Sequence, residues 1–527
     1  MCVPHFVFVE GWLTMDGRLF RYLSAAVLCL SLYNPAYSQD DLAGAVYPSD
    51  IVAPISVVQN GGRANATRQT QATDNTELRN IETLLNADPA LIRALGSASS
   101  VLGVQTSRNS FQQLIRRAVA RHPAFHAQVA TLAEGAAGKK RARAALYPQL
   151  SSQFSGDYVI TRDFDTGTDN VVESLRPREQ FTAGLSASQL VFDGGATFQR
   201  IKSARARQSE FENAISTRIN GLAFEALSAY HDLLTHQALV LLGDGIVQRH
   251  RKILSDVEER ERLGAGSRAD IQRAKARLAA SRARVSEINE SAQLAEIRYR
   301  DFFKDDPGVL SRPVIEIAHV ATRDDAVAAS MLNNPELAAA NARANASTAD
   351  FKAIKGERLP QVRVSVDATK FDIFDSGDDF DVRAGVSVQY NIFGGGLRAA
   401  NIAEAGSRAR QASFNEDQIR QEIARDAAFA FERSFGAGRR LDALAAAVIA
   451  HNATRDLTLE RYRAARGDLI DVLQAENDYF EAAVSYVTGL ANRDLAAYGL
   501  MEHTGDLLRL FSPQDAAQEY LSEGVDG

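Results

Sequence analysis

Few residues have the types and the spacing that catalysis or ligand binding requires. His122 and His126 stand four positions apart, which puts two imidazoles on one helix face and can serve to bind a metal ion. No third ligand is evident near them and Pro123 interrupts the helix, so we interpret them as a solvated surface pair. Gly394–Gly396 follows an alternating segment, as a nucleotide-binding turn would, but the residues after it lack a dinucleotide-binding pattern. We interpret this triplet as a bend between a strand and a helix.

Sequence signatures of catalysis are absent. There is no Gly-x-x-x-x-Gly-Lys-Ser/Thr phosphate-binding motif and no Gly-x-Ser-x-Gly nucleophile motif. Cys2 and Cys29 lie in a segment expected to be removed, which excludes disulfides and cysteine-ligated metals from the mature chain. The 59 Lys and Arg against 66 Asp and Glu give a formal net charge of −7. The chain therefore lacks the excess of positive charge that is typical of nucleic-acid-binding proteins. We therefore expect a protein that is not an enzyme and has no cofactor and no metal.

The first 38 residues have the pattern of a signal peptide. From Met15, an alternative start, basic residues precede the mostly apolar run Leu23–Leu32, and the small residues Ala36 and Ser38 suit cleavage before Gln39. The run is too short for a membrane anchor, which needs about 20 apolar residues. We expect the protein to be exported.

Residues 39–107 are rich in Ala, Asn, Gln, Ser and Thr, and we predict a poorly ordered extension there, with one short helix at Glu77–Leu85. No later stretch reaches the roughly 18 uncharged apolar residues of a helical membrane span. An exported chain can still cross a membrane through β-strands, whose alternating signal is weak.

An internal duplication fills most of the remaining chain. We predict a first structural repeat at 108–310, a second at 311–510 and a C-terminal tail at 511–527. The matching segments are His122-Pro123 with Asn334-Pro335, Leu146–Pro148 with Arg358–Pro360, Phe192–Gly195 with Phe393–Gly396, and Gly266–Ile271 with Gly467–Val472.

Four segments alternate polar and apolar residues with a period of two, as half-buried strands do. They are Leu150–Thr161, Phe181–Phe192, Val362–Thr369 and Val382–Ile392, and Gln189 interrupts the apolar face of the second. Four strands cannot close a membrane barrel alone, because the smallest such barrels have eight. Their open edges must pair with other copies of the chain.

Two long helices are predicted at Thr197–Leu263 and Ala400–Ala464, which contain no proline. Apolar residues recur at steps of three and four, as Ile215, Ile219 and Leu222 do in the first. A helix of this length would be roughly 100 Å long. Frequent alanines permit close helix contacts, as in a coiled bundle. Each repeat would therefore hold a helix, two strands and a long helical hairpin, which makes a mixed α and β membrane protein.

Taken together, these features resemble the TolC family of outer membrane factors, from about Phe111 to Leu510. The resemblance lies in the duplication, the Leu-Pro or Tyr-Pro before a strand, the Phe-x-Gly-Gly after a strand, and the segments Asp471–Glu476 and Thr504–Leu507. It implies a homotrimer in which each protomer gives four strands to one 12-stranded β-barrel, continued by a long α-helical coiled tunnel in the periplasm. Apolar strand faces would meet lipid, and polar faces would line a wet lumen.

By the same resemblance, the turns between the long helices, Leu263–Ile271 and Ala464–Val472, form the periplasmic entrance of the tunnel. Asp471 and Gln474 match the positions of the pore constriction in the family, where acidic rings are frequent.

The resemblance also implies an entrance latch. Asp270 and Tyr462 match a pair that helps to hold the family's entrance closed. The position of the family's partner arginine holds Gly467, with Arg466 beside it. Independently of any latch, Asp270 and Asp471 stand near predicted helix N-termini, where a carboxylate complements the helix dipole.

The function that we expect is the outer membrane exit duct of a tripartite export machine. It would be opened by a periplasmic adaptor and served by an inner membrane ABC exporter or a proton-driven pump. Asp471–Phe480 is similar to protein-secreting members, which favours type I protein secretion. Drug or metal efflux is the alternative. A non-conducting, envelope-spanning structural protein is a more distant one, because a spacer needs no polar strand faces.

Overall fold

The computed structural model describes residues 89–102, 105–106, 108–161, 163, 178–313, 320–374 and 379–512. The predicted signal peptide at 1–38, the predicted helix Glu77–Leu85 and residues 513–527 of the predicted tail lie outside them. The described chain forms two compact units. One takes in residues 136–207 and 345–411, and the other takes in the described parts of 51–135, 208–344 and 412–527.

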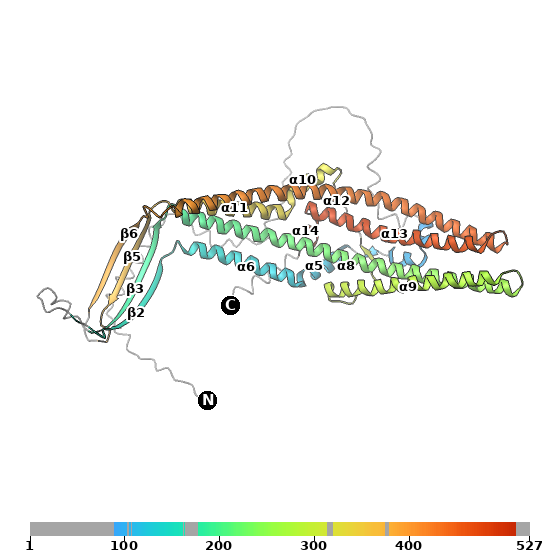
Figure 1. Ribbon diagram of the computed structural model, residues 1–527, viewed down its shortest axis with the longest axis horizontal. Helices are drawn as coiled ribbons and strands as arrows, with labels where there is room; N and C mark the ends of the chain where they lie inside the picture. Colours follow the sequence, from blue (N-terminus) through green and yellow to red (C-terminus); the bar gives the residue numbers. More distant parts are fainter. Residues whose placement is uncertain are drawn as a thin grey trace, which may run out of the picture. The chain divides into compact units, whose positions relative to one another are not determined.

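The first unit contains an antiparallel sheet of four strands, in the order β2-β3-β5-β6 (Figure 1). The strands are β2 (Gln149–Tyr158), β3 (Glu179–Phe192), β5 (Gln361–Lys370) and β6 (Phe380–Gln389). All four predicted strands are thus confirmed, with shifted ends. The sheet joins the two halves of the chain, because β3 pairs directly with β5.

The register of the sheet separates an apolar face from a polar face. Leu150 stands opposite Ala187, which stands opposite Val366, and these residues share one face. The exposed apolar residues of that face include Phe154, Tyr158, Val382, Val386 and Val388. On the other face, Ser186 donates a hydrogen bond of 2.5 Å to Asp367. Gln189 lies opposite Val364 on the apolar face, as its position in the pattern predicts, and its amide donates to the carbonyl of Leu146 at 3.1 Å.

A glycine turn connects β3 to the helix α8 (Ala196–Arg262). Gly194 has φ +69, and a Cβ there would lie 2.9 Å from Cβ of Leu359, so only glycine fits. The buried carboxylate of Asp193 accepts hydrogen bonds from the amide and the hydroxyl of Thr197, at 2.7 and 2.6 Å, and so caps the helix. Gly394–Gly396 occupies the matching place before α12 (Leu397–Arg463), which agrees with its interpretation as a bend.

The second unit is dominated by two helical hairpins (Figure 1). The first pairs α8 with α9 (Arg268–Phe303), and the second pairs α12 with α13 (Leu469–Thr504). Both long helices have 67 residues and both return helices have 36. The predicted long helices are confirmed, within three residues at each end.

Shorter elements complete the second unit. They are α3 (Pro89–Leu95), the 3-10 turn η4 (Gly96–Ala98), α4 (Ser99–Leu102), α5 (Arg108–Arg121), α10 (Arg323–Asn333), α14 (Asp506–Phe511) and a parallel pair of two-residue strands, β1 (Gln105–Thr106) and β4 (Arg312–Pro313). The helices α6 (Pro123–Ala144) and α11 (Pro335–Gly356) begin in it. Both start at a proline, Pro123 and Pro335, that the predicted repeats have in common, since proline suits the first turn of a helix.

The main core of this unit forms where α5, α8, α9, α13 and α14 meet. Its buried residues include Phe111, Ile115, Leu222, Tyr230, Phe303, Tyr498, Leu507 and Phe511. Because α14 ends at Phe511, the element runs one residue past the predicted end of the second repeat.

One prediction is wrong for part of its range. Residues 89–102 belong to the segment 39–107 that was expected to be poorly ordered, yet they form α3, η4 and α4. Leu91, Leu95 and Leu102 are almost fully buried there. The physical reason is tertiary, because a short helix with few apolar residues is stable only when those residues pack on a larger surface.

Candidate functional site

The first hairpin end is built around a capped helix start. Ser267 precedes α9, and its hydroxyl accepts a hydrogen bond from the amide of Asp270 at 3.2 Å and donates one to its carboxylate at 2.9 Å. Arg273 lies 3.0 Å from the same carboxylate. Asp270 therefore stabilises the N-terminus of α9, as the helix-dipole interpretation predicts.

The second hairpin end is less fully capped. Asp468 precedes α13 without a capping hydrogen bond from its side chain, and Asp471 stands exposed in the first turn of the helix. Gln474 is exposed one turn further, and its amide donates to Asp478 at 2.6 Å. In the turn before α13, Ala465 has φ +59, whereas Gly264 takes the left-handed conformation in the first hairpin. An alanine there carries strain that glycine avoids.

The predicted latch residues do not form one cluster within the protomer. Tyr462 is buried, and its ring lies 4.3 Å from the guanidinium carbon of Arg260. Arg260 also donates to the carbonyl of Tyr462 at 3.0 Å. Arg466 is exposed, and its amide donates to the carbonyl of Arg461. The tyrosine of the second hairpin thus meets an arginine of the first. No local sequence signal marks Arg260, because its partner stands about 200 residues later.

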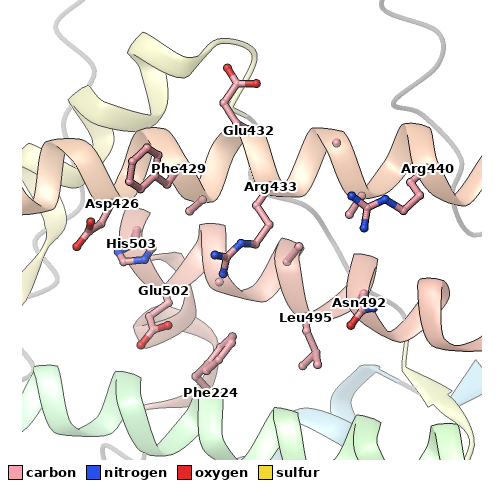
Figure 2. A pocket seen from close by; sticks show the side chains of 15 residues that line it. Phe224, Asp426, Phe429, Glu432, Arg433, Arg440, Asn492, Leu495, Glu502 and His503 are labelled. Atoms are coloured by element: carbon pink, nitrogen blue, oxygen red, sulfur yellow. The ribbon is translucent and has the colours of Figure 1, made fainter.

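A hollow of about 700 Å³ lies among α8, α12 and α13 (Figure 2). Phe224, Phe429 and Leu495 give it apolar walls, and the charged side chains of Arg433, Arg440, Asp426, Glu432 and Glu502 also line it. Figure 2 shows Glu502 extending from α13 toward α8. Burial, and then the charge of Glu225, raise the pKa of Glu502 to about 7. This carboxyl therefore takes up or releases a proton near neutral pH.

A buried ionic cluster ties the short strand β4 to the helices. The carboxylate of Asp494 is 1% exposed and accepts two hydrogen bonds from Arg312, at 2.8 and 3.0 Å. Arg493 lies 3.0 Å from the same carboxylate. Burial alone would raise the pKa of Asp494, but the two guanidinium groups hold it below its ordinary value. Burial lowers the pKa of His231, 4.0 Å away, to about 4, so this imidazole is neutral at pH 7.

Within the described ranges, no helix is long and apolar enough to cross a membrane. In the same part of the chain, no three His, Cys, Asp or Glu side chains gather to hold a metal ion. The ring of His122 stands 5.1 Å from that of Phe302, and its Nδ1 accepts a hydrogen bond from the amide of Ala124 at 3.2 Å.

Comparison with known proteins agrees with this architecture. A family model described as outer membrane efflux protein matches residues 114–301 and 327–506. That is more than half of the chain, and the chain belongs to this family. The family consists of outer membrane transport channels, not of enzymes, and the solved structures that this chain resembles are TolC-like channels.

Two relatives match over most of their length. The outer membrane efflux protein BepC of Brucella suis biovar 1 is 24% identical over 369 residues, which are 69% of this chain and 78% of BepC. Protein CyaE of Bordetella pertussis is 24% identical over 403 residues, which are 72% of this chain and 80% of CyaE.

Solved structures share the fold. The CmeC outer membrane channel of Campylobacter jejuni has a TM-score of 0.68 at 13% identity, over 80% of this chain and 92% of CmeC. The outer membrane protein VceC of Vibrio cholerae has a TM-score of 0.67 at 18% identity, over 75% of this chain and 96% of VceC.

Proposed function

We propose that the protein is the outer membrane exit duct of a tripartite export machine, a passive conduit that partner proteins open. The observation that carries this proposal is the β2-β3-β5-β6 sheet, which has one exposed apolar face and one polar face. Such a sheet suits a wall between lipid and water. A non-conducting spacer protein has no water-filled lumen, so it would not need a polar face on the inner side of that wall.

The edges of the sheet support a homotrimer. In the described residues, β2 pairs with β3 alone and β6 pairs with β5 alone, so each edge strand has one side available for another chain. Three copies of four strands would close into a 12-stranded barrel with no open edge. The apolar face would then meet outer membrane lipid.

The paired helices support a tunnel in the periplasm. The long helix has 67 residues in each hairpin, and the return helix has 36 in each. These matching lengths fit a duplicated unit whose copies alternate around a ring. A periplasmic adaptor and an inner membrane ABC exporter or proton-driven pump would supply opening and energy.

The hairpin ends would form the entrance of the tunnel. Asp471 and Gln474 are exposed on the protomer, which leaves them free to face a shared axis as the proposed constriction. Asp270, Tyr462 and Arg466 are the proposed latch, and Tyr462 would act together with Arg260, on which it packs.

Two kinds of cargo remain candidates. The likeness of Asp471–Phe480 to protein-secreting channels favours type I protein secretion. The name of the Brucella relative, outer membrane efflux protein BepC, favours the alternative of efflux. In a deletion strain, loss of a secreted protein from the medium would support the first, and increased drug or metal sensitivity would support the second.

Single-channel recording of the purified protein in a planar bilayer tests the duct. We expect the mass of three chains by light scattering and a conductance that favours cations. Three symmetry-related copies of Asp471 would make a negative ring, and such rings select cations. Asp471→Asn should therefore reduce the cation preference and weaken block by multivalent cations.

The matched control is Glu259→Gln, which removes one negative charge near the end of the first hairpin, where Glu259 already pairs with Arg262. Its selectivity should stay close to that of the wild type. Unchanged selectivity in Asp471→Asn would mean that this carboxylate is only a helix-end charge. A chain that forms no conducting species under any condition would refute the duct.

A further inference from the structure

Residues 89–102 lie across both helical hairpins of the second unit. Leu91 and Leu95 of α3 are 1% exposed, and Leu102 of α4 is 3% exposed. They share one apolar cluster with residues of the first hairpin, Leu239, Leu242 and Ile288, and of the second, Leu441, Val448, Phe480, Tyr486 and Leu490. The leucines of two short helices thus belong to one apolar cluster to which both long helices and both return helices contribute residues.

Tyr479 of α13 is the polar centre of this contact. Its hydroxyl donates a hydrogen bond to the carbonyl of Ala94, in α3. Two guanidinium groups lie over its ring, that of Arg455 from α12 at 4.3 Å and that of Arg249 from α8 at 5.1 Å. One buried side chain therefore touches the N-terminal segment, the first hairpin and the second hairpin.

Glu476, one turn before Tyr479, gives the same two arginines a buried partner. Nε of Arg249 donates to its carboxylate at 2.8 Å, and Nε of Arg455 lies 4.0 Å from it. The side chain of Glu476 is 2% exposed. Moving α8 away from α13 would leave the buried carboxylate of Glu476 without Arg249. Removing one partner of a buried ion pair is strongly unfavourable.

From these contacts we propose that residues 89–102 are a strap that clamps the two hairpins together at Tyr479 and Glu476 and so holds the entrance closed. The inference rests on the proposed duct, and it concerns how that duct is regulated. Tyr479 stands on the order of 15 Å from the start of α13. Widening the entrance requires the hairpin ends to separate, and the strap is fastened to both hairpins a short way behind those ends.

The test uses the full-length protein with Leu91→Asp and Leu95→Asp together. Charged side chains at these buried positions should release the strap. Hydrogen exchange read by mass spectrometry should show protection of residues 89–102 falling by at least about tenfold, since losing the burial of one leucine already has an effect of this size and the variant loses two. Single-channel conductance of the closed form should rise several-fold, while selectivity among cations stays unchanged.

Ile92→Asp is the matched control, because Ile92 belongs to the same helix but is 38% exposed. It should change neither protection nor conductance. Tyr479→Phe is a milder variant that removes one hydroxyl and keeps the ring under both arginines. It should also accelerate exchange in residues 89–102, in a protein that folds as the wild type does.

The outcomes distinguish failure of the strap proposal from failure of the proposed duct function. Unchanged exchange in both the double variant and Tyr479→Phe would overturn the docking of the strap. Faster exchange with unaltered closed-state conductance would overturn its role at the entrance. If neither the wild type nor the variants conduct, the duct fails, and with it the role of the strap at the entrance, while hydrogen exchange still decides whether the strap clamps the hairpins.

Discussion

Glu502 gives the protein a pH-dependent stability that a single substitution should remove. Its ordinary pKa of 4.5 is raised to about 7 by burial and by the charge of Glu225. The folded state therefore holds this proton more tightly than the unfolded state does. The stability that Glu502 contributes is complete below pH 4.5, declines as the pH rises from 4.5 to 7, and stays at its lower level above pH 7.

The magnitude follows from the two pKa values. The rise from 4.5 to about 7, at 1.36 kcal/mol per pKa unit, gives a ceiling of about 3.4 kcal/mol per chain at pH 8. Glu502 is only partly buried and lines an open hollow, so solvent screening reduces the expected effect to about 1–2 kcal/mol. Glu502→Gln keeps the shape of the side chain and removes its charge, so this cost should vanish.

Thermal unfolding at pH 5 and pH 8 measures the effect. We expect Glu502→Gln to be more stable than the wild type at pH 8, with a much smaller difference at pH 5. Glu432→Gln is the control, because Glu432 lines the same hollow but is exposed, and it should leave the pH dependence as it is. An equal effect of Glu502→Gln at both pH values would refute the reasoning, because it would reflect packing and not ionisation.

The buried cluster and the glycine turn lead to two further predictions. Asp494→Asn should destabilise the second unit by about 3–5 kcal/mol in thermal unfolding, because it leaves two buried arginines without their carboxylate. The exposed Asp442→Asn should cost far less, and equal losses would contradict this assignment. Gly195→Ala should cost about 1–2 kcal/mol for its positive φ alone, since a Cβ there meets nothing within 4 Å. Gly194→Ala should cost clearly more, because its Cβ would also collide with the neighbouring turn, and similar losses in both variants would show that the turn can move aside.

Local patterns in the sequence were sufficient for the four strands of the sheet and the two long helices. Alternation with a period of two located all four strands, and the apolar steps of three and four located the long helices. The register of β3 even bears out the place of Gln189 on the apolar face. These features are predictable because side-chain direction follows backbone periodicity within a few residues.

The candidate site was only partly accessible from sequence. The places of Asp270 and Asp471 at helix N-termini follow from the turn residues before them and are confirmed. Their roles at a constriction and a latch stay predictions, because those roles concern neighbouring protomers.

Three features were decided by tertiary structure alone. Arg260 meets Tyr462, Arg312 meets Asp494, and Leu91 and Leu95 share an apolar cluster with residues of hairpins that lie far along the chain. Pairs of this kind leave no periodic signal, because each residue is ordinary in its own segment. Burial of charge against charge, and of a short helix against long ones, becomes favourable only after the hairpins have packed.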